Sequence, residues 1–593
     1  MDWEDFRKNG KELVDYIANY LETIRTRSVF PNVKPGYMKD LLPESAPIDG
    51  ESWSSIFSDI EKVIMPGITH WQSPFMHAYF PALNCPASLL GDMLANAIGS
   101  LGFTWVNRLN VFNNYINRFI QIKFQASCPA ATELEIIVMD WLGQMIGLPG
   151  DFLHSKSNGN GGGVIQTTAS EATLVSLLAA RTEMIRRVKD EMDDSLEDAY
   201  INSRLVAYCS DQAHSSVEKA GLIGLVKMRY IESDENYSLR PDRLVEMIQL
   251  DKEQGLIPFF LCATLGTTGS CAFDNLVDLG PIANAEHMWI HVDAAYAGTA
   301  FICPEYRHWL KGIEMVQSIA FNPSKWMMVH FDCTAIWVRN SSSLHRTFNV
   351  EPLYLKHENT GLAVDFMHWQ IPLSKRFRGL KLWFVIRNYG ISGLQSHVRK
   401  GVRLAKEFEE LVKLDPRFEI PAERYLGMVV FRLKGHNELT ECLLKKLNSS
   451  GKLHCVPASL RGTYVIRFTV TSSRTELCDI QRDWYLIKEM ATMVLKSFAS
   501  EKNVHPISRG VKLAEINKKS TAFGTSLLLS NSPMTPKIIN ASFMAIFDNN
   551  DFSKDYVHYF GDMQRLGERQ SPALRRRIKG LMLTDKQHRF VRY

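Results

Sequence analysis

The sequence predicts an α/β fold with a mostly parallel sheet, preceded by a helical N-terminal segment and followed by a small α+β C-terminal domain. The main observation is an alternation of short apolar segments with segments of helix length, as in sheets whose strands are joined by crossover helices. The second is that this alternation stops near Tyr389, where a long helical pattern begins. The chain has 593 residues, too many for one core.

The composition is that of a globular protein and excludes several other classes. Hydrophobic residues make up 45% and charged residues 22%, unlike a disordered, collagen-like or coiled-coil chain. The net charge of +4 gives no reason to expect nucleic-acid binding. The ten cysteines include no CxxC pair, so we expect reduced thiols and no metal site. Because the acidic start lacks a signal-peptide pattern and no apolar run reaches ~18 residues, we expect a cytoplasmic protein without a membrane span.

Residues 1–84 are expected to form a helical dimerisation segment. Leu13, Ile17, Leu21 and Ile24 recur at helical spacing with charged residues between them. An apolar stripe this close to the start of the chain must be buried, either on the chain's own core or against a second subunit.

Residues 85–388 are expected to form the large α/β domain. Helical patterns cover residues 133–148 and 169–185. The strand candidates are Leu205–Tyr208, Val226–Tyr230, Phe259–Thr264, Trp289–Val292, Ile319–Phe321 and Cys333–Val338. In parallel sheets of this kind, ligands bind at the carboxyl ends of the strands.

Residues 389–500 are expected to form the small α+β domain. Its helical patterns cover residues 393–413 and 477–495, and its strand candidates cover 428–433 and 464–471. In residues 501–593 the periodicity fades, and 16 Lys and Arg residues stand against 8 Asp and Glu residues. This composition predicts a basic, weakly ordered tail.

Lys325 is the first residue that indicates chemistry. It lies in the sequence Phe-Asn-Pro-Ser-Lys-Trp, directly after a strand candidate and among bulky apolar groups. A lysine removed from water has a lowered pKa and becomes an amine nucleophile that can form Schiff bases.

Asp293 is the second such residue, because it closes the apolar strand candidate that begins at Trp289. A carboxylate at the ligand edge of the sheet can keep a pyridinium nitrogen protonated. Asp293 precedes Lys325 by 32 residues, about one βαβ unit.

A glycine run and a histidine complete the set. Residues 161–163 are glycines, and Thr168 and Ser170 open the helical pattern that follows them, which predicts an anion cradle at a helix N-terminus. His214 follows another strand candidate and is expected at the same edge. Together these residues indicate a pyridoxal 5'-phosphate (PLP) site. They supply a phosphate cradle, an aromatic ring to lie on the cofactor, a carboxylate for the ring nitrogen and a lysine for the Schiff base.

Residues 1 to about 500 resemble the group II PLP-dependent amino-acid decarboxylases. The resemblance is carried by residues 35–37, 70–74, 211–221, 263–268, 291–298 and 368–372. It implies the aspartate-aminotransferase-like fold, known as fold type I, for the large domain, and a homodimer with shared active sites.

The resemblance also implies roles for individual residues. Lys325 would form the Schiff base with PLP, Asp293 would hold the pyridine nitrogen, His214 would stack on the cofactor ring, and Tyr354 would donate a proton late in the reaction. The implied cofactor contacts are Thr168, Ala169, Ser170, His214, Thr268, Asp293, Ala295, Asn322 and Lys325. The implied substrate contacts are Phe80, Ala82, His214 and Ser374.

Within this family the chain is most similar to the branch that acts on histidine. Ser324 precedes the lysine where aromatic decarboxylases usually carry His, and Ser374 stands where they carry Gly. The similarity implies decarboxylation of L-histidine to histamine through a Schiff base and a quinonoid. Two alternatives stay open: decarboxylation of aromatic amino acids, and a PLP-binding paralogue that is catalytically impaired.

The second alternative depends on residues 106–125, which separate two motifs that are contiguous in the family. This insert is rich in residues with AT-rich codons, and its ends are compatible with an intron read through in frame. We hypothesise a retained intron or gene-model error; a genuine loop is the other interpretation. An insert here would block the substrate pocket or the dimer interface.

Overall fold

The computed structural model describes residues 1–102, 128–156, 160–192, 194–349 and 364–504. The chain divides into two units, residues 1–514 and 515–593, and every described residue belongs to the first. The predicted insert at 106–125, Tyr354 and nearly all of the predicted tail at 501–593 therefore lie outside the described residues.

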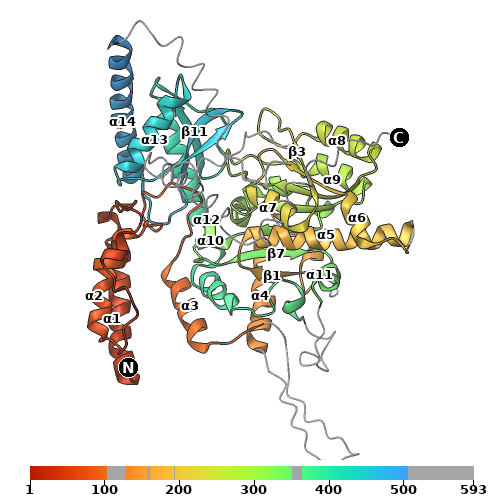
Figure 1. Cartoon of the computed structure of the whole chain (residues 1–593), viewed down its shortest axis with the longest axis horizontal. Helices are drawn as coiled ribbons and strands as arrows, with labels where there is room; N and C mark the ends of the chain where they lie inside the picture. The colour runs from red at the N-terminus through yellow and green to blue at the C-terminus, as the bar shows by residue number, and fades with distance from the viewer. Residues whose placement is uncertain (103–127, 157–159, 193, 350–363, 505–593) are drawn as a thin grey trace, which may run out of the picture. The chain divides into compact units, whose positions relative to one another are not determined.

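A seven-stranded sheet forms the centre of the large domain (Figure 1). Its strands are β1 (Gly162–Gln166), β2 (Leu205–Ser210), β3 (Lys227–Ile231), β4 (Ile257–Thr264), β5 (Trp289–Asp293), β6 (Ser318–Phe321) and β7 (Thr334–Val338). Their order is β1-β7-β6-β5-β4-β2-β3. The pairs among β2 to β6 are parallel, whereas β7 is antiparallel to both of its neighbours. The predicted fold class is confirmed.

Helices cover both faces of this sheet, because each buried strand presents apolar side chains alternately to either side. One core layer contains residues of α4 (Pro129–Ile146), α8 (Pro241–Glu253), α9 (Leu276–Ala285) and the first part of α12 (Arg378–Lys413). The opposite layer contains residues of α5 (Ala169–Glu191), α6 (Asp198–Arg204), α7 (Ser215–Gly224) and α11 (Ser341–Phe348). The strands of the large sheet are thus fixed from both sides, and their carboxyl ends are held in place.

The small domain has its own sheet and core. Strands β8 (Phe418–Glu419), β9 (Met428–Leu433), β10 (Val456–Leu460) and β11 (Thr463–Thr469) pair antiparallel in the order β10-β11-β9-β8. Helices α13 (Asn437–Ser449) and α14 (Leu477–Val504) and the second part of α12 accompany them. Gly390, with φ of 62°, kinks α12 next to the predicted boundary at residue 389. The boundaries themselves stay predictions.

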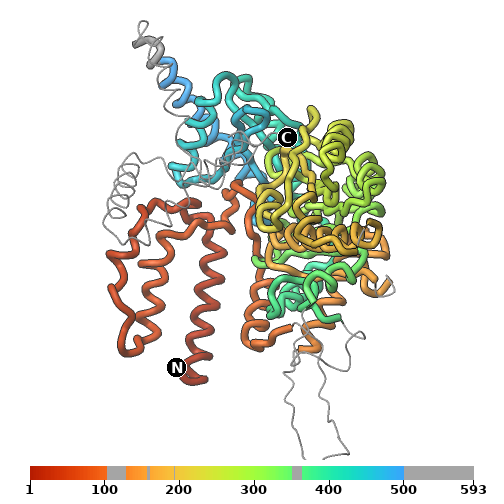
Figure 2. The backbone as a smooth tube through the Cα atoms, turned by 45° about the vertical axis from the view of Figure 1, so that its right-hand side comes forward, coloured from red at the N-terminus to blue at the C-terminus, as the bar shows by residue number. Residues whose placement is uncertain are grey.

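The N-terminal segment leaves much apolar surface uncovered. Helices α1 (Trp3–Glu22) and α2 (Trp53–Asp59) lie side by side (Figure 2), and α3 (Pro86–Ile98) packs against α12. No residue of α1 is buried, and Ile17 in the predicted stripe is 37% exposed. Exposed apolar side chains on these helices and just after α3 include Phe6, Val14, Leu90, Met93, Leu94, Ile98 and Leu101. Ile24, at the end of the predicted stripe, is buried, whereas Leu13, Ile17 and Leu21 stay at least partly exposed, so this chain covers only part of the stripe.

The predicted strands all form, with ends shifted by at most two residues. Strand β1 was not among the predicted strands, because its glycines favoured a loop that leads into a helix. The helices of the described residues include none with the length and hydropathy of a membrane-spanning segment.

Candidate active site

The carboxyl ends of the parallel strands bring the predicted residues to one edge of the large sheet. Thr264 ends β4 and is paired with Asp293, which ends β5. Asp293 is paired in turn with Ala320 of β6, and Lys325 follows five residues later. His214 follows the end of β2. Four adjacent strands thus place an amine, a carboxylate, a hydroxyl and an imidazole together.

Lys325 lies in the short helix α10 (Pro323–Trp326), whose start is fixed by the proline. Its backbone N–H donates to the carbonyl of Asn322 over 3.0 Å, and its Nζ lies 5.3 Å from the centre of the Phe80 ring. Burial lowers the pKa of Lys325; the charge of Arg467 lowers it too, whereas Asp293 opposes the change. These surroundings favour the neutral amine that can act as a nucleophile.

Asp293 is 5% exposed and is held by its own loop, because the backbone N–H of Ala295 donates to its Oδ1 over 2.9 Å. The charge of Asp293 raises the pKa values of both Lys325 and His214, whereas burial lowers them. The hydroxyl of Thr264, in the neighbouring strand, is buried without a hydrogen-bond partner. A carboxylate here can hold a proton on a bound group that lies between these side chains.

His214 precedes α7 and caps it. Its Nδ1 accepts from the backbone N–H of Ser216 over 3.2 Å and lies 2.8 Å from the Ser216 hydroxyl. Because Nδ1 accepts, the proton of the neutral ring is on Nε2. Burial of part of the ring lowers the pKa of His214, although the residue is solvent-accessible. The neutral imidazole therefore presents an N–H and a flat face at this edge.

The predicted phosphate cradle lies at the start of α5, a helix of 23 residues. Thr168 is its N-cap, and its hydroxyl accepts from the backbone N–H of Glu171 over 3.1 Å. Ala169 and Ser170 form the first turn, and Ser170 is exposed. A helix N-terminus with exposed hydroxyl and N–H groups favours a phosphate.

Phe80 connects this edge with the small domain. Its ring stacks on Tyr296, with centroids 4.0 Å apart, and the guanidinium carbon of Arg467 lies 5.0 Å from its centre. The neighbouring Ala82 accepts a hydrogen bond through its carbonyl from the Gln72 amide over 2.6 Å. The Phe80 ring thus forms an aromatic wall beside Lys325, and Ala82 belongs to the anchored backbone that follows it.

Arg467, in β11, was missed by the sequence analysis. It is 4% exposed, its Nε is buried without a hydrogen-bond partner, and burial lowers its pKa to about 10. The available signal was a charged residue inside the apolar strand Thr463–Thr469. A guanidinium next to the lysine supplies positive charge at the candidate site.

Thr268 and Ser374 are not among the residues that these contacts bring together. Thr268 is partly buried in the turn after β4, and Ser374 is exposed before α12. Tyr354 lies outside the described residues. Segment 371–372 nevertheless reaches the cradle, because Ile371 and Pro372 line a cavity of about 310 Å³ together with Thr167 and Ser170.

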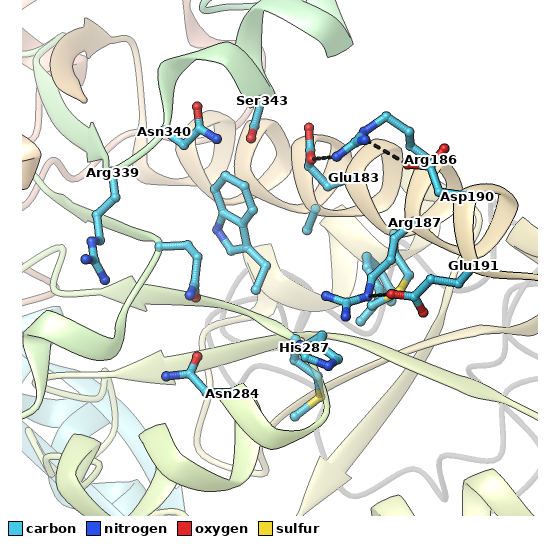
Figure 3. A pocket seen from close by; sticks show the side chains of 16 residues that line it. Glu183, Arg186, Arg187, Asp190, Glu191, Asn284, His287, Arg339, Asn340 and Ser343 are labelled. Atoms are coloured by element: carbon cyan, nitrogen blue, oxygen red, sulfur yellow. Dashed lines mark hydrogen bonds and ion pairs between the residues drawn. The ribbon is translucent and has the colours of Figure 1, made fainter. Parts of the chain in front are cut away.

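A second cavity, of about 530 Å³, lies away from all of these residues (Figure 3). It is lined by the C-terminal half of α5 and by residues at the amino ends of β4 and β5, opposite the edge with Lys325. Its charged side chains neutralise one another: Arg186 pairs with Glu183 and Asp190, and Arg187 pairs with Glu191. This arrangement favours a structural surface over a ligand site.

The residues at the strand ends fit PLP. The Asn322 side-chain oxygen is buried without a hydrogen-bond partner, and the NH2 group of the same amide can donate to a phosphate. Lys325 supplies an amine of lowered pKa and Asp293 a buried carboxylate, 32 residues apart in sequence but on adjacent strand ends. Lys325 thus suits the aldehyde of PLP, Asp293 suits its pyridine nitrogen, and Asn322 suits its phosphate.

Comparisons with known proteins agree with this arrangement. Residues 35–434 match the model of the pyridoxal-dependent decarboxylase conserved domain. The chain is 62% identical over 588 residues to histidine decarboxylase of Drosophila melanogaster, covering 99% of this chain and 66% of that protein. It is 53% identical over 498 residues to aromatic-L-amino-acid decarboxylase of Cavia porcellus, covering 84% of this chain and 99% of that one.

A solved structure supports the same fold. The crystal structure of Oryza sativa TDC with PLP and tryptamine superimposes with a TM-score of 0.76 at 38% identity, covering 83% of this chain and 99% of that chain. The chain thus spans nearly all of this structure but just under two thirds of the Drosophila protein.

Proposed function

This chain belongs to the pyridoxal-dependent decarboxylase family, and from this premise we propose that it converts L-histidine to histamine and CO2. The resemblance stated from the sequence is confirmed, as is the expectation of a PLP-dependent decarboxylase. The observation that carries the choice of substrate is the 62% identity to a histidine decarboxylase over 99% of the chain.

Lys325 would bind the aldehyde carbon of PLP through Nζ. This bond requires the neutral amine. Burial lowers the pKa of Lys325, so a larger fraction of the side chain is neutral at a given pH. Bound PLP supplies an electron sink for the electron pair released when the substrate carboxylate leaves as CO2. The carboxylate of Asp293 would keep a proton on the pyridine nitrogen, a fixed charge in a site largely removed from water.

His214 and Tyr354 would complete the reaction. The His214 ring, fixed by its bond to the Ser216 N–H, would lie against the cofactor and hold its Nε2 proton toward the site. Tyr354 would deliver a proton to the substrate Cα as general acid, the role that the family resemblance implies.

Ser374 would select the substrate. Its hydroxyl would donate to or accept from the imidazole of histidine, a bond that a catechol ring does not offer in the same place. Aromatic-amino-acid decarboxylation is the second candidate, favoured by the 53% identity to the enzyme from Cavia porcellus. Ser324 and Ser374 favour histidine over it.

We further propose a cytoplasmic homodimer with shared active sites. The exposed apolar side chains of α1 and α3 are more than a monomer usually presents to water. A second copy of the chain would cover them, and α3 is followed by Gly102, whose N–H donates to the carbonyl of Lys375, the residue after Ser374.

The test is decarboxylation by the purified chain reconstituted with PLP. We expect release of CO2 and histamine from L-histidine, with L-DOPA a poorer substrate by kcat/KM, and no release from a Lys325→Ala control. Borohydride reduction followed by peptide mapping is expected to find the pyridoxyl group on Lys325. Turnover of L-DOPA alone would favour the second candidate, and PLP binding without any CO2 release would favour the impaired paralogue.

A further inference from the structure

We infer that the buried ion pair between Glu135 and Lys375 is a positioning device that fixes Ser374 for substrate selection. This inference rests on the proposed function, because Ser374 is there the residue that distinguishes histidine from aromatic substrates. Glu135 and Lys375 are positioning residues, since they hold the backbone that carries Ser374.

The pair is fully enclosed. The Lys375 Nζ lies 2.5 Å from the Glu135 Oε1, and the two side chains are 0% and 3% exposed. The ammonium also lies 4.5 Å from the centre of the Phe366 ring. Removing two charges from water is costly, and an apolar pair of similar volume would serve stability as well or better. The ion pair is therefore better explained by a role in fixing the position of the backbone at Lys375 than by a contribution to stability.

Glu135 connects Lys375 to the phosphate cradle. Its Oε1 accepts from the backbone N–H of Ile165 over 2.7 Å, in β1. Thr167 and Thr168 follow β1 directly. One carboxylate oxygen of α4 thus accepts a hydrogen bond from the strand that leads into the cradle and forms an ion pair with the residue after Ser374.

The segment around Ser374 is anchored on both sides, whereas Ser374 itself is exposed. Before it, the Gln370 amide donates to the Pro372 carbonyl over 2.7 Å, and Pro372 lines the cavity that reaches Ser170. After it, the Lys375 carbonyl accepts from the Gly102 N–H over 3.0 Å.

Lys375 is the buried anchor among these contacts. The next cation, Arg376, pairs with Asp92 and Asp332, but its side chain is 44% exposed. An exposed pair contributes little in water, whereas a buried pair holds its geometry strictly. Displacement of the backbone at Lys375 would move the Ser374 hydroxyl directly, because the two residues are adjacent.

Selection by a single hydroxyl requires such placement. A hydrogen bond is lost when donor and acceptor separate by a few tenths of an ångström beyond about 3.2 Å. Selectivity that depends on one polar contact is correspondingly sensitive to the position of its backbone.

The test compares kcat/KM for L-histidine and L-DOPA in the PLP-loaded enzyme. Glu135→Gln/Lys375→Met removes both charges and nearly preserves volume. We expect the variant to fold and bind PLP, with the histidine preference reduced about tenfold, mainly through a higher KM for histidine. In a Ser374→Gly background, the same double substitution is expected to have no further effect on the preference.

The matched control is Arg229→Met/Asp251→Asn, which removes an ion pair of 2.6 Å between β3 and α8. It should lower stability without changing the substrate preference. If Glu135→Gln/Lys375→Met does not fold, Glu135→Asp withdraws the carboxylate while keeping both charges, and a reduced preference is again expected. An unchanged preference in the variant that folds, or an equal effect in the Ser374→Gly background, overturns the inference. Absence of histidine turnover by the unmodified chain would instead refute the proposed function.

Discussion

Lys325 and Arg467 lie over the same aromatic ring, that of Phe80, with their charged groups 5.3 Å and 5.0 Å from its centre. One cation belongs to the large domain and the other to the small domain. Both side chains have lowered pKa values, chiefly because of burial, and the charge of Arg467 further lowers the pKa values of Lys325 and His214. A charge of the small domain thus helps to lower the pKa of the lysine in the large domain.

Arg467→Met is expected to raise the pKa of Lys325, because it removes a positive charge that opposes protonation. PLP uptake by the apoenzyme, which needs the neutral amine, should then move to higher pH. On the low-pH side of the profile, the higher Lys325 pKa leaves less neutral amine, so Arg467→Met should take up PLP more slowly than the unmodified chain at the same pH. The measurement is the rate of PLP uptake between pH 6 and 9.

Arg432→Met is the matched control, since Arg432 is also a nearly buried arginine of the small sheet but pairs with Glu419. Its pH profile should follow that of the unmodified chain. A profile of Arg467→Met that does not move, or moves to lower pH, would contradict the assigned electrostatic role.

His397 should make the fold sensitive to acid. Burial lowers its pKa to about 4, and its Nε2 lies 3.0 Å from the carbonyl of Trp326, next to Lys325. Because the ordinary pKa of histidine is near 6.5, the unfolded chain takes up a proton between pH 6.5 and 4 that the folded chain refuses. The free energy of unfolding therefore decreases as the pH falls through this range, by about 2 kcal/mol between pH 7 and 5 for this group.

His397→Gln keeps a donor for the Trp326 carbonyl but does not titrate. Denaturant unfolding at pH 7 and pH 5 should show a smaller loss of stability for His397→Gln than for the unmodified chain. His436→Gln, at an exposed position before α13, should leave the pH dependence unchanged. Equal losses in all three chains would exclude His397 as the source.

The apolar surface of α1 is expected to hold a dimer together. Val14 and Ile17 are 45% and 37% exposed in the single chain, and Val14→Glu/Ile17→Glu places two charges on this surface. A buried unpaired charge is strongly unfavourable at an interface, so the variant should sediment as a monomer at micromolar concentration. Leu414→Glu, at the end of α12 and 81% exposed, should leave the sedimentation coefficient unchanged. A dimer that persists in Val14→Glu/Ile17→Glu would locate the interface elsewhere.

Much of this arrangement could be predicted from the sequence, for identifiable reasons. Strand β5 ends at Asp293 because an apolar run stops at a charged residue, and the parallel pattern then places Asp293 near Lys325. Strand β1 was not predicted, since Gly162 and Gly163 carry no strand preference and the strand forms through pairing with β7.

Contacts between distant segments could not be predicted from periodicity. Arg467 reaches Phe80 across 387 residues, and only packing of the small domain brings them together. The same holds for Glu135 and Lys375, which looked like ordinary charged residues in the sequence.

Tyr354→Phe is expected to divert the reaction. Without its phenolic proton, the substrate Cα is protonated slowly after CO2 has left, and O2 gains time to react there. The expected result is less histamine, together with consumption of O2 and release of imidazole acetaldehyde, ammonia and H2O2. Anaerobic assays are the control, since the aldehyde should disappear without O2. Histamine as the sole product in air would count against Tyr354 as the general acid.

Deletion of residues 106–125 is expected to raise kcat/KM for L-histidine, because the described residues on either side already lie close together. Gly102 packs so tightly on α4 that an added Cβ would lie 2.6 Å from the Cβ of Ala131. Residues 103–105 and 126–130 suffice to join them. Gly102 also donates to the Lys375 carbonyl, so strain introduced by the insert would act on the segment that carries Ser374.

The measurement compares CO2 release by the full-length and shortened chains, each loaded with PLP, and sequencing of spliced transcripts accompanies it. Deletion of an equally long stretch near the end of the chain, residues 574–593, serves as the control for shortening as such. If the insert is an intron read through in frame, transcripts lack it and only the 106–125 deletion gains activity. If every transcript contains it and the deletion lowers activity, the segment is a functional loop, because removing a mere obstruction cannot reduce turnover.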